Sequence, residues 1–257
     1  MQSRNRHEML KPIILMYHSV VKNDSVDPYG ISIKDFNEQI SWLDDQGYQF
    51  VSLANLVESI RDGIYGKGSK QVVLTFDDGY RDFLDQAVPV LVQRRLPATV
   101  FLVTDMLGKT ADWSSASNQT QLMTEEEVRQ IKIDGISLGS HTLTHTDITT
   151  LNEDELERQL VASRIKLADF GETFHAFSYP WGKYTDREVI AVQMAGYQCA
   201  VAIEGLLSYS NTDPFRLGRI TICRDMGLNA FRRIISRSTR LGKIVAHTQS
   251  LMLQMRK

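Results

Sequence analysis

The sequence lacks most of the features that mark specialised protein classes. Only two cysteines occur among its 257 residues, which is too few for a disulfide scaffold. The formal net charge is −2, so there is no overall electrostatic attraction for nucleic acid. No stretch approaches the roughly 20 consecutive apolar residues that a membrane-spanning helix needs. What remains is a chain with 42% hydrophobic residues, which is enough for one large core.

The N-terminus and the cysteines bear on the compartment. The first eleven residues are polar and charged, and the apolar run 13–17 is too short for the hydrophobic region of a signal peptide. We therefore expect a cytoplasmic protein, although an exported one whose signal had been removed would show the same sequence. Cys199 and Cys223 each lie in an apolar, strand-like run, which favours two free thiols over one disulfide.

Short apolar runs alternate with amphipathic segments about seven times along the chain. The runs that predict strands are 12–18, 50–53, 72–76, 98–103, 136–141, 176–180, 198–203 and 217–222. Most of the intervening segments have apolar residues at helical spacing. Strand–helix alternation is typical of parallel sheets, so the sequence predicts one α/β domain over residues 1–257, most simply a TIM-like (β/α) barrel of about seven strands.

Ionisable side chains follow several of these runs directly. Asp77 and Asp78 come after the run 72–76, where Asp-Asp-Gly is equally compatible with a solvated turn. His18 ends the first run, and His141 ends another, with His145 four residues further on. The carboxyl ends of barrel strands meet on one face, so we expect these side chains to converge.

A metal site explains the grouping better than coincidence does. An isolated His-x-x-x-His is more often a loop feature than a ligand pair, and Thr142 stands where a zinc-protease signature has glutamate. Together, however, Asp78, His141 and His145 supply the three nitrogen and oxygen ligands that a mononuclear site with one open position needs.

Two of these motifs resemble a known family. The segments Thr75–Gly79 and Ser140–His145 are similar to the first two motifs of the polysaccharide deacetylases, the NodB-homology domain of carbohydrate esterase family 4. The resemblance extends from about Ile13 to Ile222. It implies a distorted (β/α) barrel, often seven-stranded, and a metal-dependent hydrolase that removes acetyl groups from N-acetylated or sometimes O-acetylated sugars.

The resemblance also implies a role for each residue. Asp77 corresponds to the general base, and Asp78, His141 and His145 correspond to ligands of a divalent metal, with Zn²⁺ favoured. Leu15–Ser19 resembles the N-terminal histidine motif of a circularly permuted branch that includes the poly-N-acetylglucosamine deacetylases.

On that analogy His18 is the general acid. The late Leu-x-His of other members is missing, and His247 in the polar tail is a poor substitute.

The third family motif is only partly matched. Tyr179, Pro180 and Trp181 resemble the segment whose backbone N–H binds the oxyanion, but the arginine that commonly opens it is replaced by Phe177-Ser178. Arg219 is a candidate to orient Asp77 in its place.

Four aromatic residues are candidates for stacking on a sugar, with ordinary packing as the alternative: Tyr80, Trp113, Trp181 and Tyr184.

The C-terminal extension 224–257 combines an apolar stripe with basic residues that include Arg232, Arg233 and Arg237. We interpret it as an outer barrel helix with a solvated basic face. The alternative is a peripheral contact with anionic headgroups or a lipid-linked sugar phosphate.

The sequence therefore predicts an enzyme that deacetylates a carbohydrate, whether a polysaccharide, an oligosaccharide or a glycan precursor. Alternatives within the enzyme class are an O-acetyl esterase and a deformylase of a lipid-linked amino sugar. A non-catalytic carbohydrate-binding module on the same scaffold is the alternative outside it, and the full set of predicted catalytic and metal residues argues against that.

Overall fold

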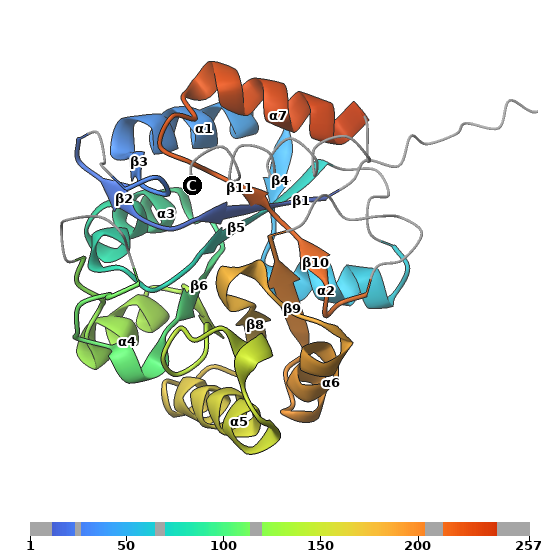
Figure 1. Ribbon diagram of the computed structural model, residues 1–257. Helices are drawn as coiled ribbons and strands as arrows, with labels where there is room; N and C mark the ends of the chain where they lie inside the picture. Colours follow the sequence, from blue (N-terminus) through green and yellow to red (C-terminus); the bar gives the residue numbers. More distant parts are fainter. Residues whose placement is uncertain (1–11, 24–26, 65–69, 114–119, 204–212, 241–257) are drawn as a thin grey trace, which may run out of the picture.

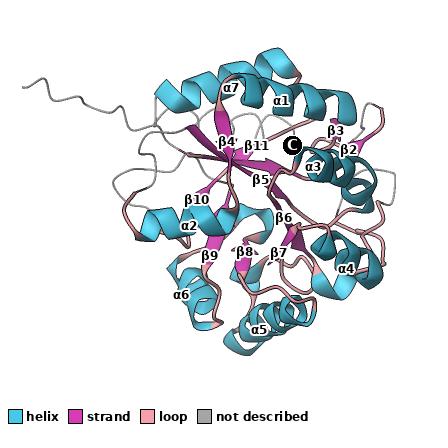
Figure 2. Cartoon of the chain, turned by 180° about the vertical axis from the view of Figure 1, so that it is seen from behind, coloured by secondary structure: helices cyan, strands magenta, loops and turns pink. Residues whose placement is uncertain are grey.

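The computed structural model describes residues 12–23, 27–64, 70–113, 120–203 and 213–240. Its centre is a parallel sheet curled into a distorted barrel, with helices packed around the outside (Figures 1 and 2). Six neighbouring strands form most of the wall: β1 (Ile13–Tyr17), β5 (Lys70–Phe76), β6 (Ala98–Leu102), β7 (Ser137–Ser140), β8 (Ala176–Ser178) and β9 (Cys199–Ala202). The predicted α/β barrel is therefore confirmed.

Two very short strands join the edges of this sheet. β10 (Leu217–Gly218) pairs with β9, and β11 (Ile220–Thr221) pairs with β1. The run 217–222, predicted as one strand, is thus divided at Arg219. The chain changes partner there, because a single strand has to bridge the two edges that the curled sheet leaves apart.

Smaller strands complete the arrangement. β4 (Tyr48–Phe50) pairs with the start of β5, while β2 (Val20–Val21) and β3 (Ile31–Ser32) form a separate parallel pair. The strand predicted at 50–53 was placed too late. Leu53 begins a helix because the Ser52 side chain caps it by accepting the N–H of Asn55.

The helices cover the outer face of the sheet in chain order: α1 (Ile33–Asp45), α2 (Leu53–Arg61), α3 (Val88–Arg94), α4 (Glu125–Ile133), α5 (Glu153–Asp169), α6 (Asp186–Met194) and α7 (Leu228–Arg240). Four short helical turns occur in the connections: η1 (Phe83–Ala87), η2 (Thr104–Met106), η3 (Ile148–Thr150) and η4 (Pro180–Gly182). A capping box formed by Thr124 and Glu127 is present at the start of α4.

The described part of the C-terminal extension is an outer helix. Phe231 and Ile235 on α7 are fully buried, and the Phe231 ring meets the Trp42 ring of α1 edge-on, with centroids 5.8 Å apart. Residues 241–257 of the predicted extension, with His247, lie outside the described residues.

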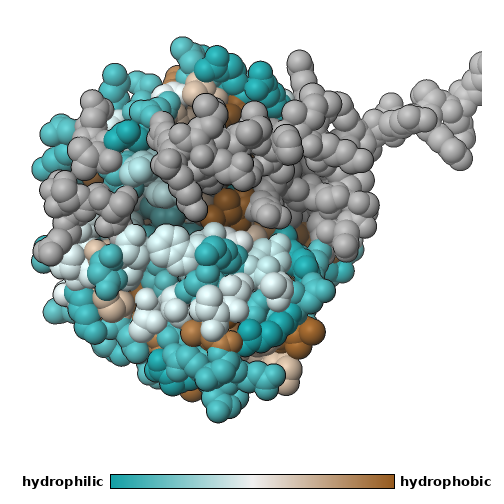
Figure 3. Space-filling view, in the orientation of Figure 1, coloured by the Kyte–Doolittle hydropathy of each residue, from teal (hydrophilic) through white to brown (hydrophobic). Residues whose placement is uncertain are grey.

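Two further observations concern the cysteines and the helices. Neither Cys199 nor Cys223 forms a disulfide. Among the helices that the structure describes, none combines the length and the hydropathy that crossing a bilayer requires. In the space-filling view of Figure 3, hydrophilic residues dominate the lower part of the molecule, where Figure 1 places α5.

Candidate active site

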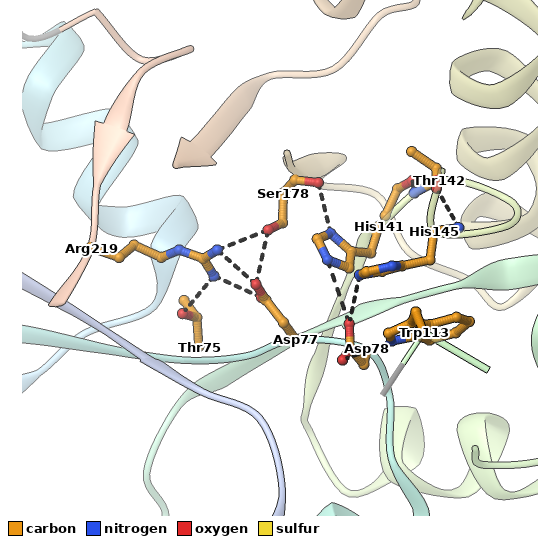
Figure 4. Close-up of polar contacts among 10 residues, drawn as sticks. Thr75, Asp77, Asp78, Trp113, His141, Thr142, His145, Ser178 and Arg219 are labelled. Carbon is orange, nitrogen blue, oxygen red and sulfur yellow. Dashed lines mark hydrogen bonds and ion pairs between the residues drawn. The ribbon is translucent and has the colours of Figure 1, made fainter. Parts of the chain in front are cut away.

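The predicted site residues gather at the carboxyl ends of neighbouring strands. Asp77 and Asp78 follow β5, His141 and His145 follow β7, and Ser178 ends β8 (Figure 4). Parallel strands place these ends on one face of the barrel.

Three of these side chains point their ligand atoms at one another. The Nε2 atoms of His141 and His145 lie 3.5 Å and 3.3 Å from Asp78 Oδ1. All three residues are buried, and one ligand atom from each lies within 4.8 Å of the other two. This is the set that the sequence predicted as metal ligands.

The group fits a cation better than it fits a hydrogen-bonded cluster. Asp78 Oδ1 is buried without a hydrogen-bond partner, although an unpaired buried carboxylate oxygen is costly. His141 Nδ1 lies 2.8 Å from the carbonyl oxygen of Ser178, which fixes the N–H on that nitrogen and leaves Nε2 as a lone-pair donor. Burial lowers the pKa of His141 to about 4, so the ring is neutral as a metal ligand must be.

Two tryptophans enclose His145. The Trp113 ring stacks on the imidazole, with ring centroids 4.4 Å apart, and its Nε1 donates to Asp78 Oδ2 at 3.3 Å. Trp181 meets the same imidazole edge-on at 4.7 Å and is half exposed. One face of Trp113 is therefore occupied by the protein itself, and its contact with a sugar stays a prediction.

Asp77 faces the opposite way, into a buried ion pair. Its two oxygens accept from Nη1 and Nη2 of Arg219, each at 2.7 Å. Ser178 Oγ donates to Asp77 Oδ2 at 3.2 Å and accepts from Arg219 Nη2 at 2.9 Å. Arg219 also donates to Thr75 Oγ1, so the carboxylate lies in a fixed orientation.

Arg219 reaches Asp77 because it stands at the break between β10 and β11. Its side chain is 1% exposed, and its Nε donates to the carbonyl oxygen of Ala202 at the end of β9. The contact between the Arg219 guanidinium and Asp77 is the one that the sequence led us to expect in place of the missing motif arginine.

The two adjacent carboxyls are both ionised at neutral pH. Burial alone would raise the pKa of Asp77, but Arg219, then His141 and His18, hold it below its ordinary value. Burial acts in the same direction on Asp78, but the neighbouring imidazoles of His145, His18 and His141 hold its pKa well below the ordinary range.

Backbone strain is concentrated at this site. Five non-glycine residues in the described part of the chain have a left-handed φ, and four of them belong to the site: Asp78, Thr142, His145 and Trp181. Such conformations cost energy and persist where the surroundings impose them, which is common at functional sites. Gly79 has a φ of 77°, and a Cβ there would come within 2.8 Å of Leu102.

His18 lies at the end of β1, beside the carboxylates. It is half buried, its ring centroid is 4.9 Å from that of Tyr29, and its Nδ1 is buried without a hydrogen-bond partner. Tyr17, which precedes it, pairs with Phe76 in the parallel β1–β5 ladder, so His18 lies on the same side of the barrel as Asp77 and Asp78.

Tyr179 and Tyr184 are used differently from the sequence-based expectation. The Tyr179 N–H donates to Val201 O, its hydroxyl donates to Phe215 O, and its ring stacks on Tyr184 at 4.4 Å. Tyr179 is therefore a buried support for the loop rather than a donor to substrate. Pro180, which follows it, is buried as well.

Sequence reasoning missed Ser178 and the burial of Tyr80. Ser178 links both halves of the site, yet a serine at a strand end carries no recognisable pattern. Tyr80, proposed for stacking, is 3% exposed, so its ring lies inside the protein.

A barrel of parallel strands that presents an Asp–His–His group and an arginine-bound carboxylate at its carboxyl ends has the architecture of a hydrolytic enzyme. The sequence model of the family described as polysaccharide deacetylase matches residues 65–200, just over half of the chain. The chain belongs to the polysaccharide deacetylase family.

The sequence of this chain is similar to those of individual relatives over most of their length. YxkH of Bacillus subtilis (strain 168), assigned to the polysaccharide deacetylases, is 29% identical over 220 residues, covering 85% of this chain and 74% of YxkH. The poly-beta-1,6-N-acetyl-D-glucosamine N-deacetylase of Staphylococcus epidermidis is 25% identical over 243 residues, covering 86% of this chain and 82% of that protein.

Solved structures share the fold. The Streptococcus pyogenes deacetylase PplD in complex with acetate superposes with a TM-score of 0.75 at 25% identity, over 88% of this chain and 98% of PplD. IcaB from Ammonifex degensii superposes with a TM-score of 0.73 at 19% identity, over 90% and 97% of the two chains, which shows likeness of fold alone.

Proposed function

We propose that this protein is a metal-dependent N-deacetylase of N-acetylglucosamine polymers or oligomers, with Zn²⁺ as the resident metal. The observation that carries the proposal is the buried Asp78–His141–His145 group beside the arginine-held carboxylate of Asp77. Two imidazole nitrogens and one carboxylate oxygen are a donor set that Zn²⁺ favours.

A cation held by the three ligands supplies a Lewis acid for the acetyl carbonyl and lowers the pKa of water from 15.7 to about 7. The Asp77 carboxylate, fixed by Arg219, accepts a proton from the attacking water. A C–O bond to the acetyl carbon then forms, and the C–N bond breaks.

The leaving nitrogen needs a proton, because an amide anion is a very poor leaving group. His18 donates it from the end of β1, a role worth roughly 10²–10⁴-fold in rate. The products are acetate and a free amino sugar. The proton that Asp77 took from water then returns to His18 through solvent, which restores both groups for the next turnover. A backbone N–H near Trp181 is proposed to bind the developing oxyanion.

The names of the relatives support a proposal for the substrate class. The chain covers 82% of a staphylococcal protein named for β-1,6-linked poly-N-acetylglucosamine. The half-exposed Trp181 beside His145 offers a flat apolar surface for a sugar ring at the site. We therefore propose β-1,6-linked N-acetylglucosamine as the preferred substrate.

The test measures acetate release from β-1,6-linked N-acetylglucosamine oligomers and, in parallel, from chitooligosaccharides of the same length. Release from the β-1,6 series by wild type, with loss in Asp77→Asn and His18→Ala proteins that still bind zinc, supports the proposal. Release only from chitooligosaccharides would overturn the linkage. No release from either, with zinc bound, would overturn the N-deacetylase assignment.

A further inference from the structure

The segment that carries His18 is tied to the segment that follows the two aspartates. Ser19 Oγ donates a short hydrogen bond to Asp82 Oδ2, and the N–H of Val20 donates to Asp82 Oδ1 at 3.2 Å. Asp82 directly precedes η1, four residues after Asp78. A single carboxylate therefore links the β1 end of the site to the β5 end.

His18 has few restraints of its own. Its Nδ1 is buried without a hydrogen-bond partner, and its ring contact is with Tyr29. The backbone before it is fixed, since Tyr17 O accepts the N–H of Asp77 at 2.9 Å. After it, the Asp82 carboxylate holds Ser19 and Val20. The direction of the imidazole thus depends on how firmly the chain is held on both sides.

Holding this loop through the buried Asp82 carboxylate has a free-energy cost. Among the described residues no basic side chain lies within ion-pair distance of it, and burial raises its pKa to about 6 even though the hydrogen bonds from Ser19 and Val20 oppose the shift. A perturbed carboxyl beside a catalytic group is a candidate for a functional role.

We propose that Asp82 is a positioning residue, which holds the Ser19–Val20 backbone so that the His18 imidazole points at the leaving nitrogen. This inference rests on the proposed function, in which His18 is the general acid. Proton transfer depends steeply on geometry, and a displacement of about 1 Å can reduce the rate roughly 10²-fold.

If Asp82 positions His18, the loss of rate on removing Asp82 should depend on the leaving group of the substrate. Removing the restraint impairs proton donation, which matters for an amide nitrogen. It matters little for 4-nitrophenyl acetate, because 4-nitrophenolate departs without a proton. A carboxylate that merely stabilised the fold would affect both reactions alike.

The experiment compares kcat for an N-acetylglucosamine oligomer and for 4-nitrophenyl acetate in the zinc-loaded proteins. The variants are Asp82→Ala and Ser19→Ala, with His18→Ala as reference and Asp85→Ala as matched control. Asp85 is an exposed carboxylate on η1, one turn further along. Zinc content and thermal unfolding are measured on every variant.

We expect Asp82→Ala and Ser19→Ala to lose roughly 10- to 100-fold in kcat on the amide and less than about threefold on the ester. Asp85→Ala should match wild type on both. In the His18→Ala background, Asp82→Ala should cause no further loss on the amide, since the group that it positions is already gone.

Three results overturn the inference. Equal losses on amide and ester, or an added loss in the double variant, would make Asp82 purely structural. If Asp82→Ala does not fold, Ser19→Ala decides alone, and unchanged kcat on the amide would count against the inference. Failure of wild type and Asp85→Ala to cleave the amide at all would instead show that the proposed function is wrong.

Discussion

Asp77 and Asp78 are neighbours in sequence, yet they face environments of opposite kinds. Asp77 has every oxygen satisfied by Arg219 and Ser178, so its side of the site is complete in the protein alone. Asp78 keeps one buried oxygen without a hydrogen-bond partner, opposite two imidazole nitrogens. The Asp77 half is therefore held complete by the protein's own residues, whereas the Asp78 half has the unpaired donor atoms that a cation would take up.

The largest effect is expected for the half of the site formed by Asp78, His141 and His145. His141→Ala removes a ligand whose orientation is fixed by Ser178 O, so the remaining pair should bind zinc poorly. We expect zinc content to fall below one equivalent and amide hydrolysis to fall by about 10³-fold or more, because the metal supplies several kcal/mol. Elemental analysis and acetate release measure both. Full zinc binding by the variant would contradict the division of the site.

The half of the site formed by Asp77 and Arg219 should respond in stability as well as in activity. Arg219→Met leaves the Asp77 charge buried and unpaired, which should lower the free energy of unfolding by about 3–5 kcal/mol in urea denaturation. Adding Asp77→Asn should recover most of this loss.

The control is Arg216→Met, which breaks the more exposed pairs with Asp186 and Asp213 and should lose only about 0–1 kcal/mol. Equal losses in the two arginine variants would show that the buried pair has no special weight.

Trp113 sharpens the comparison because it contacts His145 and Asp78 of the proposed metal group. Trp113→Phe keeps a ring beside His145 but removes the N–H donated to Asp78. Loss of such an outer contact should weaken zinc binding roughly 10-fold, and Trp113→Leu should weaken it further, within the range of about 10- to 100-fold. Competition with a chromophoric chelator measures the affinity. Unaltered affinity in both variants would limit Trp113 to substrate contact.

The smallest effect concerns Asp82, for which the described residues supply no cation partner. Its folded pKa of about 6 lies above the unfolded value, so the wild type is relatively stable below pH 4 and loses that advantage as the pH rises through 6. Asp82→Asn has no such penalty. It should therefore gain roughly 1–3 kcal/mol over wild type at pH 8 and little at pH 4. A gain independent of pH in thermal unfolding would refute this.

The same contrast explains what could be predicted from sequence. Asp78, His141 and His145 follow apolar runs, and parallel topology brings strand ends together, so their convergence was predictable. The exchange of the motif arginine for Arg219 could only be suggested, because it depends on a strand that changes partner midway. The links made by Ser178 and Asp82 involve side chains that carry no pattern. Tyr179 and Tyr80 lie within or beside a recognisable motif, yet their side chains pack in the core. For them the motif alone gave the wrong expectation.

The most direct test is to strip the protein of metal and follow acetate release from β-1,6-linked N-acetylglucosamine oligomers while Zn²⁺ is added back, with His141→Ala alongside. If zinc bound by Asp78, His141 and His145 is required for hydrolysis, the stripped protein should release no acetate. Activity should then recover and saturate at one equivalent of zinc, and His141→Ala should show no recovery. Full activity of the metal-free protein, or recovery in His141→Ala equal to wild type, would contradict this requirement for zinc.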